Sequence, residues 1–207
     1  MEELDRDLWD QAAAGSDAAF ATLFERHASS VYNYCFRRRG NWAEAEDLTS
    51  ATFLEAWRRR DEVLLANDSI RPWLLGVATN LFRNDIRSRR RRETALQRLA
   101  VIEERPQDGL ADDVAGRIDD ERRMKAVLEQ LKKLPPEHQE VVALVVWSEL
   151  TYEEAAIALG VPAGTVKSRL SRARRGLMEL EGDNGHDTQD RDALARASTT
   201  QPREVEG

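Results

Sequence analysis

Apolar residues recur at three- and four-residue steps over much of the chain, which is the spacing of one buried helix face. The segment DAAFATLFERHASSVYNYCFRRR carries such a stripe, made of Phe20, Leu23, Phe24, His27, Val31 and Tyr34. Gly40 and Asn41 interrupt it, and WAEAEDLTSATFLEAWRRR and PWLLGVATNLFRNDIRSRRRR resume the helical spacing. The pattern predicts a helical unit over residues 17–92, preceded by a helical lead-in over residues 1–16.

A second helical unit is predicted over residues 122–180. MKAVLEQLKKL is amphipathic, and the short segment that follows Pro135 and Pro136 is apolar on most sides. TYEEAAIALG begins with Thr151 and has Glu154 three residues later, which is the spacing of a capping box. Gly160 is expected to end that helix. The helix after it has an apolar inner face made of Val166, Leu170, Ala173, Leu177 and Leu180.

The remaining segments are polar. Residues 103–121 hold eight acidic residues against two arginines, and too few apolar residues to bury. We therefore interpret residues 93–121 as a flexible acidic linker and residues 181–207 as a disordered tail. The predicted fold class is all-α, with two small helical domains joined by this linker and a helix-turn-helix in the C-terminal one.

Charge is segregated along the chain. The formal net charge is −7, yet the helix after Gly160 carries five basic residues and no acidic one between Thr165 and Arg175. A second basic cluster follows Arg83. Phosphate binding depends on local clusters of Lys and Arg, so a net acidic chain can still bind nucleic acid. The alternative interpretation is that this basic helix face is only solvated and does not bind nucleic acid.

The outer face of the last helix has the chemistry of a DNA-reading surface. If the apolar stripe faces the core, then Lys167, Ser168, Ser171, Arg172 and Arg175 face outward. Such side chains reach base edges and phosphates in a major groove, where Arg binds guanine in bidentate fashion. Thr165, near the helix start, is placed to hydrogen-bond a phosphate.

Several other functions find no support in the sequence. The first residues carry no basic and apolar leader pattern, and the longest apolar run, VVALVVW, is too short to cross a bilayer, so no membrane insertion is expected. The single cysteine, Cys35, cannot form an internal disulfide, which favours a cytoplasmic protein. The three histidines are scattered and there is no Gly-rich phosphate loop, so we expect a non-enzyme without cofactor or metal.

Two separate segments resemble one family. LPPEHQEVVALVVWSELTYEEAAIALGVPAGTVKSRLSRARRGL resembles the C-terminal promoter-binding domain of bacterial RNA polymerase sigma factors of the extracytoplasmic-function (ECF) group. FATLFERHASSVYNYCFRRRGNWAEAEDLTSATFLEAWRR, followed by RPWLLGVATNLFRNDIRSRRRR, resembles their other conserved domain. The resemblance covers about residues 17–180, with both domains in the family's order.

The resemblance implies two promoter contacts. The C-terminal domain is expected to read the minus-35 element as duplex, through Thr165, Lys167, Ser168, Arg169, Ser171, Arg172 and Arg175. The N-terminal domain is expected to capture the minus-10 element as melted strand, through Asn67, Asp68, Ser69, Asn80, Arg83, Asn84 and Arg87. The loop of residues 61–70 remains open to interpretation as an ordinary connection, and RSRRRR as a basic helix end that complements the helix dipole.

The resemblance also implies protein partners. Core RNA polymerase, through its β and β′ subunits, is the main expected partner, and an anti-sigma factor is the second. Asp47, Leu48, Phe53 and Trp57 are the candidates for docking on the β′ clamp, although Phe53 and Trp57 are equally interpretable as core residues. The chain departs from the family pattern at Ser50 and Ala51. The acidic linker is either a mimic of nucleic acid inside polymerase or a solubilising tether.

Two other functions remain as alternatives. The first is a stand-alone helix-turn-helix regulator, which would bind duplex promoter DNA without polymerase. The second is a nucleic-acid enzyme or RNA-binding protein that uses RSRRRR as an arm. The leading hypothesis is a non-catalytic alternative sigma factor that directs promoter-specific initiation.

Overall fold

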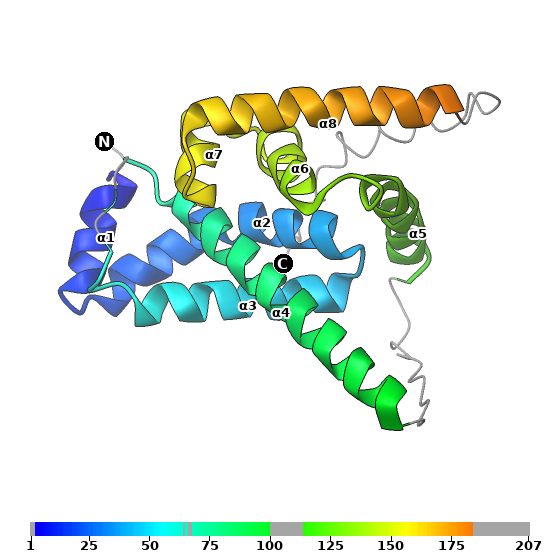
Figure 1. Cartoon of the computed structure of the whole chain (residues 1–207). Helices are drawn as coiled ribbons and strands as arrows, with labels where there is room; N and C mark the ends of the chain where they lie inside the picture. The colour runs from blue at the N-terminus through cyan, green and yellow to red at the C-terminus, as the bar shows by residue number, and fades with distance from the viewer. Residues whose placement is uncertain (1–2, 64, 66–67, 100–113, 184–207) are drawn as a thin grey trace.

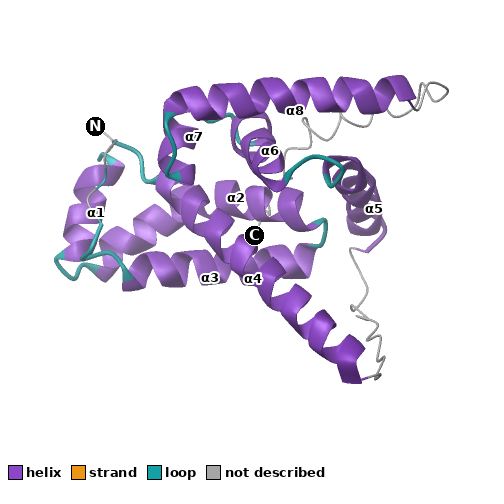
Figure 2. Cartoon of the chain, viewed as in Figure 1, coloured by secondary structure: helices purple, strands orange, loops and turns teal. Residues whose placement is uncertain are grey.

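A computed structural model describes residues 3–63, 65, 68–99 and 114–183, and within these ranges it contains only helices and loops (Figures 1 and 2). The all-α prediction is confirmed for this part of the chain. The N-terminal unit is built from α1 (Asp5–Ala13), α2 (Asp17–Arg39), α3 (Trp42–Arg58) and α4 (Arg71–Leu99). The C-terminal unit is built from α5 (Val114–Leu131), α6 (Pro136–Val141), the π-helix η1 (Val142–Trp147), α7 (Tyr152–Leu159) and α8 (Ala163–Asp183).

Local sequence explains where the N-terminal helices begin and end. The Ser16 hydroxyl accepts a hydrogen bond from the backbone N–H of Ala19 at the start of α2. Gly40 ends α2 in the left-handed region at φ 64°, where a side chain would be strained. Asn41 then caps α3 by accepting from the N–H of Glu44. Gly40 and Asn41 therefore form the predicted break: Gly40 ends α2 and Asn41 caps α3.

The core of the N-terminal unit lies where α2, α3 and α4 meet. Leu23, Val31 and Tyr34 of α2 are almost fully buried, together with Leu74 and Leu75 of α4. The Tyr34 hydroxyl lies 2.6 Å from the Thr79 hydroxyl, which in turn donates to a backbone carbonyl of α4. This bond satisfies the one polar atom of a fully buried ring.

Cys35 is part of the same core. Its side chain has no exposed surface. Burial raises the pKa of this thiol to about 11, and the neighbouring Thr49 and Arg39 only partly offset the effect. Cys35 is thus a free cysteine inside the core.

The predicted capping box at the start of α7 is present. Thr151 accepts from the N–H of Glu154, and the Glu154 carboxylate accepts from the N–H of Thr151 at 2.8 Å. Gly160 ends the helix with φ 65°. The turn that follows leads into α8, which Figure 1 shows lying across α6 and α7. The two helices form the predicted helix-turn-helix.

The two units pack against each other, mainly through α4 and α7. At their crossing a Cβ atom on Gly76 would lie 2.6 Å from the carbonyl oxygen of Ala158, so only glycine permits this approach. The carbonyls of Trp147 and Ser148, at the open end of η1, accept hydrogen bonds from Arg37 and Arg71. Two cations from the N-terminal unit thus satisfy carbonyls that the π-helix leaves without partners.

The structure differs from the expected linker at both ends. Helix α4 continues to Leu99 and α5 already begins at Val114, so only residues 100–113 lie outside the described helices, and their structure is not described. Helix α5 is anchored because Trp42 donates its backbone N–H to the Glu121 carboxylate and its indole N–H to the Arg117 carbonyl. These contacts explain why an acidic segment with few apolar residues is helical. Helix α8 likewise runs to Asp183, into the predicted tail, and the domain boundaries stay a prediction.

Candidate nucleic-acid interface

Helix α8 is positioned by its apolar stripe. Val166, Leu170 and Ala173 are buried, as the sequence predicts. Leu177 is half-buried against the core, and Gly176 passes so close to Leu134 that a Cβ atom there would lie 2.8 Å from its side chain. The stripe fixes the rotation of the helix about its own axis, and with it the direction of every polar side chain.

The opposite face of α8 is polar and exposed. Lys167, Ser168, Ser171, Arg172 and Arg175 are exposed, whereas Thr165 and Arg169 are half-buried. Among the described residues, none of the five basic side chains of α8 forms an ion pair with an acidic group. The one side-chain hydrogen bond within the set joins the Ser168 hydroxyl to the Thr165 carbonyl at 3.0 Å. This surface can meet an anion without first breaking an internal pair.

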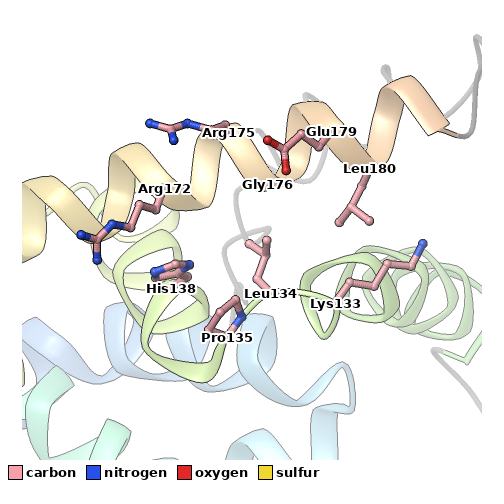
Figure 3. Close-up of a pocket in the computed structure, with 9 residues that line it drawn as sticks. All are labelled: Lys133, Leu134, Pro135, His138, Arg172, Arg175, Gly176, Glu179 and Leu180. Carbon is pink, nitrogen blue, oxygen red and sulfur yellow. The ribbon is translucent and has the colours of Figure 1, made fainter.

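An open pocket of about 520 Å³ lies where α8 passes over α6 and the end of α5 (Figure 3). Its basic lining residues include Lys133, His138 and Arg172, and Glu179 is its acidic one. In Figure 3 Arg172 extends toward His138 of α6, whereas Arg175 extends away from it. Arg172 and Arg175 are three residues apart, so they lie on the same side of the helix and both line the pocket, with their guanidinium groups pointing in different directions.

The candidates on α4 have a different environment. Asn80, Asn84 and Arg87 are exposed along one side of the helix. Arg83 is half-buried, and its guanidinium forms a bidentate pair with Glu140 of α6, with N–O distances of 2.6 and 2.5 Å. The hydrogen bonds to Glu140 raise the pKa of Arg83. The Arg83 side chain also donates to the Asn80 amide oxygen at 3.1 Å.

Two of the candidate residues in the loop before α4, Asp68 and Ser69, also have partners within the protein. Asp68 is exposed and forms an ion pair with Arg6 at 3.2 Å. The Ser69 hydroxyl donates to the Asp5 carboxylate at 3.2 Å and accepts from the N–H of Arg71. Asn67 lies outside the described residues. Ser69 therefore links the start of α4 to Asp5 of α1.

The polymerase candidates on α3 divide into buried and exposed side chains. Leu48 and Phe53 are buried, at 7% and 5% exposure, so they support the helix from inside. Asp47 is exposed, and Trp57 is half-buried beneath the Arg60 guanidinium, whose central carbon lies 3.8 Å from the ring centroid. Only these last two present a surface to a partner in this conformation.

Two exposed apolar side chains beside them were missed. Phe24 is 44% exposed and Leu54 is 51% exposed. The Phe24 ring lies 4.7 Å from the buried ring of Phe53, so it continues the core out to the surface. Phe24 was assigned to the buried stripe of its helix, because a stripe does not show where the covering helix ends. Nothing in the local sequence marks Leu54.

Asp5 is a further residue that the sequence did not single out. It is buried although charged, and its carboxylate contacts residues of α2 and of the connection into α4.

No described helix is long and apolar enough to cross a membrane.

Comparison with known proteins identifies two family segments. The family model "Sigma-70 region 2" matches residues 23–92, and "Sigma-70, region 4" matches residues 124–177. They correspond to the two helical units, in the predicted order.

Curated relatives match across both units. The chain is 32% identical over 182 residues to the ECF RNA polymerase sigma factor BldN of Streptomyces coelicolor, covering 86% of this chain and 66% of that protein. It is 33% identical over 180 residues to the ECF RNA polymerase sigma factor SigE of Mycolicibacterium smegmatis, covering 85% of this chain and 68% of that protein. The chain thus spans about two thirds of the length of these two relatives. It is 32% identical over 169 residues to the RNA polymerase sigma factor CarQ of Myxococcus xanthus, covering 92% of that protein.

Solved structures share the fold. CnrH, in complex with the cytosolic domain of CnrY, matches with a TM-score of 0.63 and 26% identity over 87% of this chain and 99% of that one. The sigma factor RpoE of Bartonella quintana, in complex with the anti-sigma factor NepR, matches with a TM-score of 0.58 and 27% identity over 78% of this chain and 95% of that one. The two region matches and these relatives together show that the chain belongs to the ECF group of RNA polymerase sigma factors, non-catalytic subunits that direct polymerase to promoters.

Proposed function

We propose that this sigma factor reads the minus-35 element as duplex DNA with α8 and the minus-10 element as a melted strand with α4 and the loop before it. The observation that carries the proposal is the exposed polar face of α8, whose basic side chains have no acidic partner among the described residues. A major groove admits a helix and rewards Arg and Lys at its surface. Lys167 and Arg172 are assigned to bases, and Arg169 and Arg175 to phosphates.

The minus-10 assignment rests on α4. Asn80, Asn84 and Arg87 form an exposed polar strip that suits a single strand, because amides hydrogen-bond base edges and arginine neutralises phosphates. Arg83 joins this strip once Glu140 releases it. Asn67 and Asp68 at the loop are assigned to an extruded base.

Core RNA polymerase, through its β and β′ subunits, is the proposed protein partner. The exposed Phe24 and Leu54, next to Asp47 and Trp57, form the apolar surface on the N-terminal unit that suits such a docking. An anti-sigma factor is proposed as the second partner, since the related RpoE was solved with one. A cytoplasmic location is proposed together with these partners.

Run-off transcription with purified core polymerase on genomic fragments tests the proposal. The expected result is initiation only when the protein and core enzyme are both present, from fragments that share two spaced sequence elements. Pre-melting the minus-10 element in a synthetic promoter should reduce the dependence on duplex opening but preserve the dependence on the minus-10 bases. Initiation that is indifferent to those bases would contradict the assignment to α4.

The stand-alone regulator is distinguished by binding to DNA without polymerase. A sigma factor of this type should bind duplex promoter weakly alone and tightly as holoenzyme. Equal affinity in both conditions would favour the regulator. Unchanged transcription in both Arg172→Ala and Lys167→Ala would remove α8 from its assigned role.

A further inference from the structure

Helix α1 lies before residues 23–92, which the region 2 model covers, yet it contacts the connection between α3 and α4 at both ends. At the near end, the Trp9 indole N–H donates to the Val63 carbonyl at 2.9 Å. At the far end, the Asp5 carboxylate accepts from the Ser69 hydroxyl and from the N–H of Ile70, each at 3.2 Å. Helix α1 therefore contacts described residues at both ends of this connection.

The Asp5 carboxylate is held from the other side by α2. His27 lies 2.6 Å from one carboxylate oxygen, and Arg26 donates to the other at 3.2 Å. With these two side chains behind it and two donors from the loop in front, the carboxylate has little rotational freedom. Burial alone would raise the pKa of Asp5, but the charge of His27 and the hydrogen bonds from Ile70, His27 and Arg26 outweigh it and leave that pKa lowered. The group is therefore charged at neutral pH.

The contact is transmitted to the start of α4. The Ser69 hydroxyl that donates to Asp5 also accepts from the N–H of Arg71, so it caps α4. Ile70 is 1% exposed, and Trp9 packs against Trp73 with ring centroids 5.3 Å apart. The far end of the loop and the first turn of α4 are thus fixed together.

We propose that α1 is the clamp that holds the described ends of the minus-10 reading loop, at Val63 and at Ser69 and Ile70, with Asp5 and Trp9 as its positioning residues. The inference rests on the proposed function of the loop. Leu8, Trp9 and Ala12 pack α1 into the core, and the polar contacts supply the partners that the buried Asp5 carboxylate and Trp9 indole need. Asp5 also contacts His27 and Arg26 of α2, whereas its contacts to Ser69 and Ile70 and the contact of Trp9 to Val63 reach the loop. Holding a loop in its bound shape lowers the entropy that binding would otherwise cost, and favours one base over another.

The experiment compares four variants in holoenzyme transcription on a promoter panel. Asp5→Asn removes the charge, and Trp9→Phe removes only the indole N–H and part of the ring. Arg6→Ala removes the exposed pair with Asp68 and leaves the core untouched. Asp7→Asn is the control, because Asp7 is an exposed acid on the same helix. The panel substitutes each base of the minus-10 element and, separately, each base of the minus-35 element.

The measured quantity is the ratio of transcription from the matched promoter to that from each substituted one. We expect Asp5→Asn and Trp9→Phe to lower the minus-10 ratio about tenfold, because one mismatched base typically changes binding by a factor of this order. Arg6→Ala should lower it less, and Asp7→Asn should leave it unchanged. The minus-35 ratio and the affinity for core polymerase should stay the same in all four variants.

Two results would overturn the proposal. An equal fall in transcription from every promoter, with unchanged ratios, would show that α1 only stabilises the fold. Unchanged ratios in Arg6→Ala and Trp9→Phe would do so even where Asp5→Asn fails to fold. A wild-type protein that ignores the minus-10 bases would instead refute the proposed function of the loop, which is a separate outcome.

Discussion

The basic residues of α4 and those of α8 occupy contrasting environments. On α4, Arg83 is paired with Glu140, and Arg89 is paired with Asp85 and Glu44. On α8, no basic side chain has an acidic partner among the described residues. Arg83 and Arg89 of α4 are therefore engaged with acids, whereas the basic side chains of α8 and the exposed Arg87 of α4 are not, within the described residues. A basic cluster in a sequence therefore does not show whether its side chains are exposed or already paired with acidic groups.

The cause of the difference is the packing of the two units. Glu140 is buried, at 4% exposure, where α6 faces α4, and a buried carboxylate needs a cation beside it. Arg83 supplies that cation. Helix α8 lies on the far side of α6 and α7 from this contact, so no buried acid reaches its outer face (Figure 1).

The largest expected effect comes from forcing α4 and α7 apart with Gly76→Ala. Within a helix this change normally stabilises by up to about 1 kcal/mol. Here the new Cβ would lie 2.6 Å from the Ala158 carbonyl, so we expect a net loss of about 2 kcal/mol in the free energy of unfolding. Urea unfolding measures the loss, and small-angle scattering should report a larger radius of gyration.

Gly164→Ala is the matched control for this variant. No heavy atom lies within 4 Å of a Cβ at Gly164, so the substitution should be neutral or slightly stabilising. If Gly76→Ala behaved like Gly164→Ala, then α4 and α7 would not be packed together in solution.

The next effect comes from removing the pair that distinguishes α4. Glu140→Gln keeps the shape of the side chain but removes the charge that holds Arg83. We expect a loss of about 1.5 kcal/mol in the free energy of unfolding, the usual size of a hydrogen bond to a charged group. A double-mutant cycle with Arg83→Gln should give a coupling energy of about 1 kcal/mol.

The exposed pair of Glu129 and Lys132 serves as the reference. Both side chains are more than 60% exposed, so Glu129→Gln should change stability by less than about 0.5 kcal/mol. A coupling energy for Arg83 and Glu140 no larger than this would mean that α4 and α8 do not differ in the way described.

A third prediction concerns α8 alone. Arg172→Ala should lower promoter-dependent transcription about tenfold, or about 1.4 kcal/mol, by removing one groove contact. Arg174→Ala removes an equal charge from an exposed position of the same helix and should have a much smaller effect. Neither variant should shift the urea midpoint, because neither side chain has an acidic partner in the described part of the chain. If Arg172→Ala and Arg174→Ala lowered transcription equally, α8 would contribute only positive charge and no specific groove contact at Arg172.

The smallest effect is the pH dependence of the α4 pairs. Burial alone would raise the pKa of Asp85, but the hydrogen bonds and charges of Arg39 and Arg89 outweigh it and hold that pKa below its ordinary value. A lowered pKa in the folded state means stability that is present above the ordinary aspartate pKa and lost as the pH falls through the folded value. Because Asp85 is 35% exposed, screening keeps this contribution well under about 1 kcal/mol.

Urea unfolding of wild type and Asp85→Asn at pH 7 and pH 3 measures this term. The wild type should be the more stable at pH 7, and the difference should shrink at pH 3. A difference that stayed constant with pH would assign the effect of the substitution to packing instead of charge.

The parts of the fold that depend on neighbours in sequence were predictable. The stripe of Val166, Leu170 and Ala173 is buried as expected, and the capping box of Thr151 and Glu154 forms. Helical periodicity and caps act over three or four residues, so one chain displays them directly.

Contacts between distant residues were not predictable in the same way. Arg83 and Glu140 are 57 residues apart, and Asp5 and Ile70 are 65 apart. Nothing near Arg83 distinguishes it from Arg87, which stays exposed. Phe24 fits a helical stripe as well as any buried residue does, and its exposure depends on how far α3 covers α2. Such outcomes are fixed by tertiary packing, which local patterns do not encode.

The burial of Cys35 makes this thiol a reporter of local opening of the N-terminal unit. It is the only thiol in the chain, and with a pKa raised to about 11 it is almost entirely protonated at neutral pH. A thiol reagent can therefore modify it only in molecules whose α2 and α3 have separated. At reagent concentrations where the rate of modification stays proportional to the reagent, that rate yields the local free energy of opening without any denaturant. The effect of α1 docking, of promoter DNA or of polymerase on these openings can each be measured as a decrease in the rate of Cys35 modification.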